Sequence, residues 1–195
     1  MLSGVSDATR KPSKSLNPSL SLSEAPRSLT LRRLGRLFFF GSIALILIVD
    51  QLTKAWVVAH LPLYEPSDLW QWLAPILSFT YVRNTGVAFG LFQGLSRVFA
   101  LLPVLVVVAV VAFRRSLPVG DLWVHLSLGL VVGGALGNVI DRLLRGYVVD
   151  FLDVNFRPLQ SWPVFNVADS AVVVGVAILL LDTFLAQAEE APADA

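Results

Sequence analysis

The sequence predicts an all-α membrane protein with four transmembrane helices and a small extracytoplasmic, β-containing interfacial element. Of its 195 residues, 55% are apolar and 15% are charged, which is typical of integral membrane proteins. A hydrocarbon core of about 30 Å needs roughly 20 apolar residues in a helix, and four stretches approach that length. We expect the spans at about residues 37–61, 96–113, 122–144 and 165–185.

Polar segments flank the predicted four-span membrane domain, which we place at residues 35–186. Residues 1–34 are rich in Ser and Pro, lack apolar periodicity and end in a basic cluster, which predicts a disordered basic tail. Residues 187–195 form an acidic tail. A cleavable signal peptide is the alternative for the N-terminal region. The first apolar run continues into AWVVAHL without an A-x-A site, which favours a retained first span.

The first span carries Asp50 and Lys54 in its second half. At a spacing of four residues they share one helix face, and an acid that precedes a base in this order can form an ion pair. One interpretation is a self-neutralising pair whose charges reach toward the interface. The other is a buried pair that organises a site, because ionisable groups at membrane depth are costly and usually functional.

The segment between the first two spans fits neither a membrane helix nor a free loop. Three prolines exclude a long helix, and Trp70 and Trp72 are typical of a membrane interface. ILSFTYVRN, residues 76–84, alternates β-branched and aromatic residues and precedes turn and glycine signals, which predicts a small β element. Arg83 and Asn84 end this strand, where ordinary turn chemistry is an alternative to a site role.

The remaining spans differ in their polar content. The second has no polar residue inside it, which indicates a scaffold helix. In the third, Gly129, Gly133 and Gly137 recur every four residues, a spacing that lets two helices approach closely in lipid. Packing alone explains these glycines. The loop before the fourth span contains VVDFLDV, a short β-branched run.

Basic residues indicate the orientation. They are dense before the first span and recur as Arg114 and Arg115 after the second, which places both termini and the second loop in the cytoplasm. Arg142, Arg145 and Arg157, around the last loop, oppose this assignment. The cluster before the first span outweighs them because the first helix usually dominates.

This topology gathers polar side chains at one depth, toward the external leaflet. They lie in the late turns of spans 1 and 3 and the first turns of span 4: Asp50, Lys54, Asn138, Asp141, Arg142, Asn166 and Asp169. Asp150 follows span 3 closely enough to fold back onto the same rim. Two carboxylates there that share one proton could hydrolyse a peptide without a covalent intermediate. The residue pattern by itself does not separate Asp150 from Asp141.

Several other chemistries lack their sequence signatures. There is no cysteine, which excludes disulfides, thiolate catalysis and thiolate metal sites. No zinc-protease, serine-hydrolase or phosphate-binding motif is present, so we expect no metal and no cofactor. With 15 basic and 14 acidic residues, nothing suggests nucleic acid as a partner. A proton-coupled carrier and a structural membrane subunit stay open, although the first shows no internal repeat and the second leaves the clustered carboxylates unexplained.

Four motifs in order resemble the conserved boxes of the bacterial lipoprotein signal peptidase family, also called signal peptidase II. They are VDQLTKAWV, FTYVRNTGVAFGLF, GGALGNVIDRLLRGYVVDF and WPVFNVADSAVVVGV, and the resemblance covers about residues 37–185. It implies an intramembrane aspartyl protease that removes the signal peptide from diacylglyceryl-modified prolipoproteins, just before the lipidated cysteine. Residues 35–186 would then be a protease domain in the bacterial inner membrane, expected to contact lipids and to act as a monomer.

The resemblance also assigns the site residues. It implies that Asp150 and Asp169 are the catalytic pair, and it makes the choice against Asp141. The residues that match the family's supporting polar positions are Asp50, Lys54, Asn84, Asn138, Asp141, Arg142 and Asn166.

Overall fold

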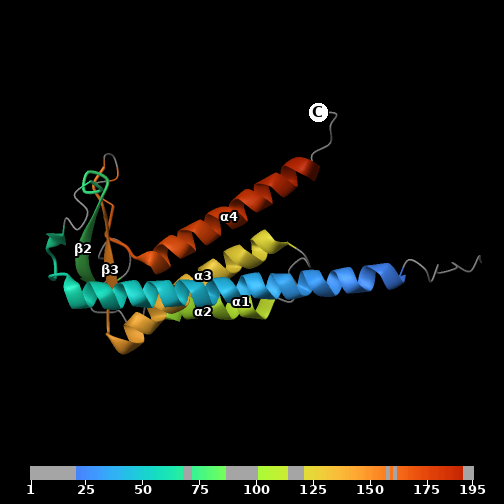
Figure 1. Ribbon diagram of the computed structural model, residues 1–195, viewed down its shortest axis with the longest axis horizontal. Helices are drawn as coiled ribbons and strands as arrows, with labels where there is room; N and C mark the ends of the chain where they lie inside the picture. The colour runs from blue at the N-terminus through green and yellow to red at the C-terminus, as the bar shows by residue number, and fades with distance from the viewer. Residues whose placement is uncertain are drawn as a thin grey trace, which may run out of the picture.

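The computed structural model describes residues 21–67, 72–86, 101–113, 121–156, 159 and 162–190. The elements in chain order are α1 (Ser21–His60), β1 (Pro66–Ser67), β2 (Leu77–Asn84), α2 (Leu101–Phe113), α3 (Leu122–Leu144), β3 (Val148–Val154) and α4 (Val167–Glu190). Figure 1 shows a helical body with the strands β2 and β3 at one end, beside the C-terminal end of α1 and the N-terminal end of α4. The predicted helical fold with a small β element is confirmed.

Among the described residues, three helices are long and apolar enough to cross a membrane by length and composition: Leu29–His60, Leu122–Leu144 and Val167–Leu185. They correspond to three of the four predicted spans. α2 contributes a shorter apolar helix, Pro103–Ala112. Several residues used in the sequence predictions lie outside the described ranges, namely 1–20, Trp70, 96–100, Arg114, Arg115 and Arg157. The four-span topology therefore stays a prediction.

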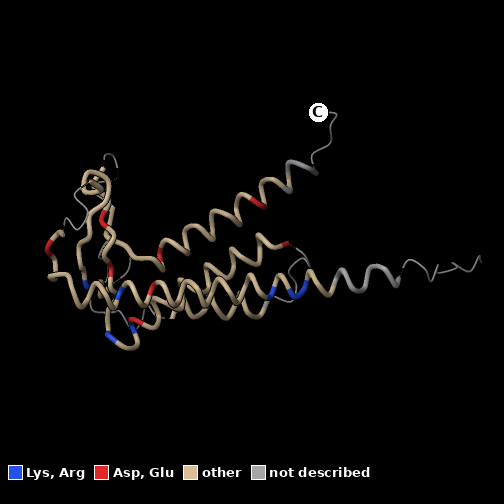
Figure 2. The backbone as a smooth tube through the Cα atoms, viewed as in Figure 1, with Lys and Arg blue, Asp and Glu red and all other residues tan. Residues whose placement is uncertain are grey.

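The first helix is longer than the predicted first span. α1 begins at Ser21, inside the segment that the sequence assigns to a disordered tail. Leu and Arg dominate LTLRRLGR, residues 29–36, and both are good helix formers, so the helix continues beyond the apolar run. Figure 2 shows basic residues along this end of α1 and further charges gathered near the sheet. At the other terminus, α4 reaches Glu190, within the predicted acidic tail.

The sheet is antiparallel with the order β1-β2-β3. The strand predicted at 76–84 is observed at Leu77–Asn84, and its partner β3 is the VVDFLDV run of the last loop. Val82 pairs with Asp150 and Asn84 pairs with Val148, after a register irregularity between Phe79 and Val82. This register sets Asn84 beside the strand segment that carries Asp150.

A small apolar core fixes the sheet to the membrane helices. It consists of the buried side chains Val57, Leu61, Tyr81, Val149 and Phe151. Val57 lies in α1, Leu61 directly follows this helix, and the other three belong to β2 and β3, so the core joins the sheet to the end of α1. Burying an aliphatic or aromatic side chain contributes about 1.5–3 kcal/mol, so this cluster resists separation of the sheet from α1.

α3 lies between α1 and α4 and uses different glycines for each. A side chain at Gly133 would press on Ile43 and Ile46 of α1, whereas one at Gly134 would overlap the backbone of α4. The predicted glycine stripe therefore packs against α1, and the adjacent Gly134 makes the approach to α4. α3 ends at Leu144, and Gly146, at φ +80°, turns the chain into β3.

Candidate active site

Two carboxyl groups line the same cavity where the sheet joins the helices. Asp150 lies on β3 and its side chain is 2% exposed, and Asp169 lies in the first turn of α4. Strand alternation and the pairing of β3 with β2 turn Asp150 toward the helix ends. The site thus takes its two acids from separate elements on opposite sides of the last loop.

Two asparagine amides hold Asp150. Asn84 Nδ2 donates to Asp150 Oδ2 at 2.9 Å, and Asn166 Nδ2 donates to Oδ1 at 2.6 Å. The Asn84 oxygen is itself held, because it accepts a hydrogen bond from the Gly86 N–H at 3.0 Å. Both oxygens of this carboxyl group therefore receive an N–H donor from an oriented side chain.

Asp169 has a similar pair of donors. Asn138 Nδ2 donates to Asp169 Oδ1 at 2.7 Å, and the Asn166 backbone N–H donates to Oδ2 at 3.2 Å. In return the Asp169 N–H donates to Asn166 Oδ1 at 2.9 Å, a reciprocal arrangement that caps α4. Since Asn166 also binds Asp150, this one residue is hydrogen-bonded to both acids.

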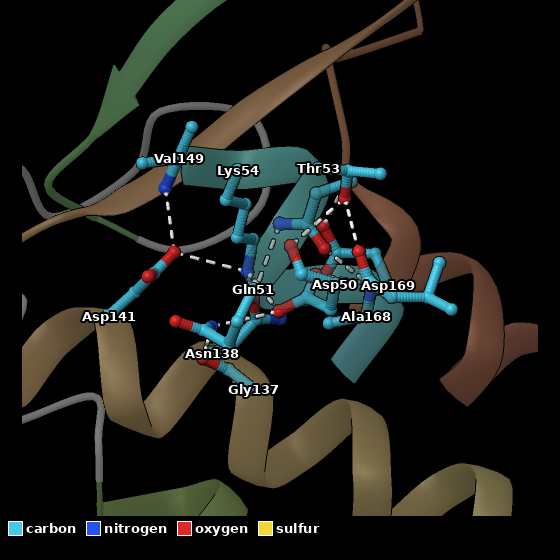
Figure 3. Close-up of polar contacts among 12 residues, drawn as sticks. Asp50, Gln51, Thr53, Lys54, Gly137, Asn138, Asp141, Val149, Ala168 and Asp169 are labelled. Atoms are coloured by element: carbon cyan, nitrogen blue, oxygen red, sulfur yellow. Dashed lines mark hydrogen bonds and ion pairs between the residues drawn. The ribbon is translucent and has the colours of Figure 1, made fainter. Parts of the chain in front are cut away.

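A buried charge cluster contacts the Asn138 amide through Lys54 (Figure 3). Lys54 and its two carboxylate partners are completely buried, with Nζ 2.9 Å from Asp50 Oδ2 and 3.1 Å from Asp141 Oδ2. Arg145 also pairs with Asp141. The buried interpretation of the Asp50 and Lys54 pair is therefore confirmed, and the alternative in which their charges reach toward the interface is wrong.

Each acid of this cluster binds one backbone N–H close to the central carboxyl groups. Asp50 Oδ1 accepts from Ala168 N at 3.0 Å, and Asp141 Oδ2 accepts from Val149 N at 3.1 Å. These donors precede Asp169 and Asp150 in the chain. The cluster thereby fixes the start of α4 and the start of β3 relative to α1 and α3.

Arg142 is a third cation at the site. Its side chain is 8% exposed, and its Nη2 donates to the Gly86 carbonyl at 3.3 Å. Within the described part of the chain, its Nε is the buried side-chain nitrogen that has no hydrogen-bond partner. This N–H can donate to a group that enters the site.

A cavity of about 750 Å³ opens beside the two carboxyl groups. Polar side chains line one part of it, and apolar residues of α2, α3, α4 and the last loop form the rest, including Val106, Val131, Ala135, Val148, Trp162, Phe165, Val172 and Val173. This volume lies within the range of small-molecule and cofactor pockets. The cavity can hold an apolar chain next to the two carboxyl groups.

The environment of Asp150 changes its acidity. Burial raises the pKa of Asp150 from 3.8 to about 7, and the negative charge of Asp169 acts in the same direction. Hydrogen bonds from Asn84 and Asn166 and the positive charge of Lys54 oppose the rise, because they favour the carboxylate. Both protonation states of Asp150 are therefore accessible near neutral pH, as acid and base catalysis requires.

All of the predicted site residues belong to this one neighbourhood. The contacts above join Asp150 and Asp169 to the supporting set Asp50, Lys54, Asn84, Asn138, Asp141, Arg142 and Asn166. The sequence prediction missed Gln51, whose Nε2 donates to Asp50 Oδ2 at 3.1 Å and to the Gly137 carbonyl at 3.2 Å. Its position as an amide inside an apolar run was the signal available. Among the described residues, no group of three or more His, Asp or Glu is placed to hold a metal ion.

A family model and the curated relatives of this chain point to the same protein family. A family model described as signal peptidase (SPase) II matches residues 42–185. A lipoprotein signal peptidase of Shewanella pealeana is 40% identical over 161 residues, covering 80% of this chain and 91% of that protein. A lipoprotein signal peptidase of Syntrophomonas wolfei is 43% identical over 143 residues, covering 73% and 90%.

A solved structure described as a bacterial membrane enzyme has the same fold. It resembles this chain with a TM-score of 0.70 and 28% sequence identity, over 79% of this chain and 92% of that one. Its membrane setting agrees with the apolar helices described above. The chain belongs to the signal peptidase II family, the membrane proteases that remove signal peptides from prolipoproteins.

Proposed function

We propose that this protein is an aspartic endopeptidase that removes the signal peptide from diacylglyceryl-modified prolipoproteins, cutting just before the lipidated cysteine. The observation that carries the proposal is the pair of carboxyl groups, Asp150 and Asp169, at the polar part of an apolar cavity. Both acids are held by amide donors from three asparagines. Such a pair can activate water and the substrate carbonyl together.

In the proposed reaction one member of the pair is ionised and the other is protonated. The ionised carboxylate takes a proton from water, whose oxygen attacks the scissile carbonyl carbon, while the protonated acid donates its proton to the carbonyl oxygen. The tetrahedral intermediate then collapses. Its C–N bond breaks as a proton passes to the leaving amine, and the shared proton is restored to the pair. The two apparent pKa values belong to the pair as a whole. The roles of general acid and general base are therefore assigned to the pair and not to Asp150 or Asp169 individually.

The amides of Asn84, Asn138 and Asn166 stabilise the ionised form of the two acids and fix their positions. An N–H donor on each carboxyl group favours the ionised form and opposes the effect of burial. Because the donors come from β2, α3 and the start of α4, they also fix where the acids lie. Preorganised donors of this kind need no rearrangement during the reaction.

The shape of the cavity supports a lipidated substrate. Its walls are predominantly apolar, as expected for a site that accepts acyl chains, and its polar groups lie beside the two acids. A diacylglyceryl chain in the apolar part would bring the peptide bond before the modified cysteine to the carboxyl groups. Binding of the lipid then positions the scissile bond.

The purified protein and a peptide pair test this function. One peptide carries a diacylglyceryl group on the cysteine after the signal sequence, and its control has an unmodified cysteine. We expect mass spectrometry to show cleavage of the lipidated peptide with the modified cysteine as the new N-terminus. Equal cleavage of both peptides would contradict the substrate assignment, and no cleavage of either would contradict the activity.

Asn84→Ala should lower kcat about 100-fold while leaving the protein folded. The change removes the N–H donor on Asp150 Oδ2 and leaves the strand pairing, which uses backbone groups, in place. Cleavage assays and thermal unfolding of the same preparation measure both effects. Full activity in Asn84→Ala would reduce this residue to turn chemistry.

We further propose a four-span, monomeric protein of the bacterial inner membrane, with both termini in the cytoplasm and the site toward the outer leaflet. α2 is the remaining span, and its apolar helix Leu101–Phe113 precedes two arginines in the sequence. Reporter fusions after residue 195 and within residues 116–120 should label from the cytoplasm. Labelling from the periplasm at either position would contradict this orientation.

A further inference from the structure

We infer that Lys54 is a positioning residue for the proposed catalytic pair, acting by fixing which way the Asn138 amide points. The inference rests on the proposed function and adds a role for a residue that does not touch Asp150 or Asp169 in the contacts described. It assigns to the buried ion pair a contribution to turnover in addition to its packing.

The amide of Asn138 has two nearly isosteric ends with opposite hydrogen-bonding character. Lys54 Nζ lies 3.0 Å from Asn138 Oδ1, and an ammonium can only donate. The oxygen must therefore face Lys54, which leaves the NH2 end to donate to Asp169 Oδ1 at 2.7 Å. A flipped amide would set N–H groups against the ammonium and its oxygen against a carboxyl oxygen. Asn166 Nδ2 donates to the same oxygen at 3.2 Å, so Lys54 and Asn166 together select the orientation that the pair requires, and Lys54 supplies the charged and shorter of the two contacts.

The same ammonium is linked to both acids by short paths. Through Asp50 it is connected to the Ala168 N–H, directly before Asp169. Through Asp141 it is connected to the Val149 N–H, directly before Asp150. Figure 3 shows Lys54 reaching from α1 into the space between Asp141 and Asn138. A single buried cation therefore sets the relative placement of the two backbone segments that carry the pair.

A purely structural ion pair would hold α1 against α3 without affecting the chemistry. The two roles are separable because an ion pair can be replaced by neutral groups of similar size, often with little loss of stability. Removing Lys54 alone would leave Asp50 buried without its cation. The informative change therefore removes both charges together.

The double substitution Asp50→Asn with Lys54→Met meets this requirement. It deletes one negative and one positive charge and preserves side-chain length. A carboxamide oxygen at position 50 can still accept from the Ala168 N–H. Asp141 keeps Arg145 and the Val149 N–H, so no buried carboxylate loses its last partner. What is lost is the ammonium donor to Asn138 Oδ1, which leaves the neutral Asn166 amide as the donor that holds this oxygen.

We expect this double variant to insert and unfold at nearly the native temperature, and to have a kcat lowered about 100-fold with KM changed less than about threefold. Its pH–rate profile should also shift to higher pH, because the charge of Lys54 favours the ionised form of Asp150. The other groups that act on Asp150 are retained: Arg142 on α3, Asp169 on α4, and the amides of Asn84 and Asn166.

Thr53→Val is the matched control on the same helix. In the part of the chain that the structure describes, the Thr53 hydroxyl donates to carbonyls of its own helix, at Val49 and Asp50, so this variant should keep native kcat and native pH dependence. Both variants are assayed with the lipidated peptide, at several substrate concentrations and from pH 4 to pH 9 in about one-unit steps.

Three outcomes would overturn the inference. One is a folded double variant with near-native kcat. Another is a change in KM alone, and the third is failure to fold, which would make the ion pair a packing element. Absence of cleavage by the wild-type protein would count against the proposed function instead, so the two failures are distinguishable.

Discussion

Asp150→Asn is expected to abolish cleavage of the lipidated peptide, with a loss of about 10,000-fold or more in kcat, in protein that still folds. The substitution keeps the size of the side chain and removes its ionisation. One oxygen acceptor for Asn84 or Asn166 is lost, but a buried carboxyl group that opposes folding is removed as well. Asp169→Asn should behave in the same way because the pair shares one proton.

The double variant of Asp150 and Asp169 should be no worse than either single variant. Residues that act as one unit are strongly non-additive, since the loss of either already removes the unit. Asp141→Asn is the control. It weakens contacts to Lys54 and the Val149 N–H, so it should impair the enzyme and leave residual activity. A dead Asp141→Asn together with near-normal cleavage by Asp150→Asn would show that the pair is wrongly assigned.

Gly134→Ala is expected to lower both activity and stability, with a loss of about 100-fold in kcat and about 1–3 kcal/mol of stability. A methyl group at this position would overlap the carbonyl oxygen of Ala168 and lie 2.8 Å from Val172 Cγ2. The first obstacle is backbone, which cannot rotate away. The start of α4 would have to move, and Asp169 would move with it.

Gly41→Ala is the matched control for this glycine. Nothing lies within 4 Å of a side chain added there, so activity should be native, and helix propensity favours alanine by about 0.5–1 kcal/mol. Cleavage kinetics and thermal unfolding of both variants measure these effects on kcat and on stability. Native kcat in Gly134→Ala would mean that the close contact between α3 and α4 does not position Asp169.

The sequence pattern predicted the membrane helices better than their contacts. Apolar length located three of the helices, and β-branched alternation located β2. The pairing of β2 with β3 joins segments far apart in the chain, and its register depends on an irregularity that no local pattern encodes. The period of the glycine stripe identified Gly133, but not that the neighbouring Gly134 carries the contact with α4.

For the site, too, the sequence predicted which residues take part but not how they contact one another. Polar residues in apolar spans are expensive, so their positions could be read from the sequence. Residue spacing left Asp141 and Asp150 as equal candidates, and the family resemblance chose between them. In the structure they differ in surroundings: Asp141 binds Lys54 and Arg145, whereas the side chains that bind Asp150 within the described ranges are the amides of Asn84 and Asn166. The direction of each amide depends on three-dimensional contacts and could not be predicted.

The pH dependence of kcat/KM for the lipidated peptide tests the shared proton most directly. Below the lower apparent pKa both acids are protonated and no base remains, and above the upper one both are ionised and no acid remains. Because burial raises the pKa of Asp150 to about 7, activity should fall as the pH rises through that region. We expect a bell-shaped pH profile of kcat/KM, and Asp150→Asn should eliminate it. A rate that stays constant or keeps rising from pH 5 to about pH 9 would contradict it.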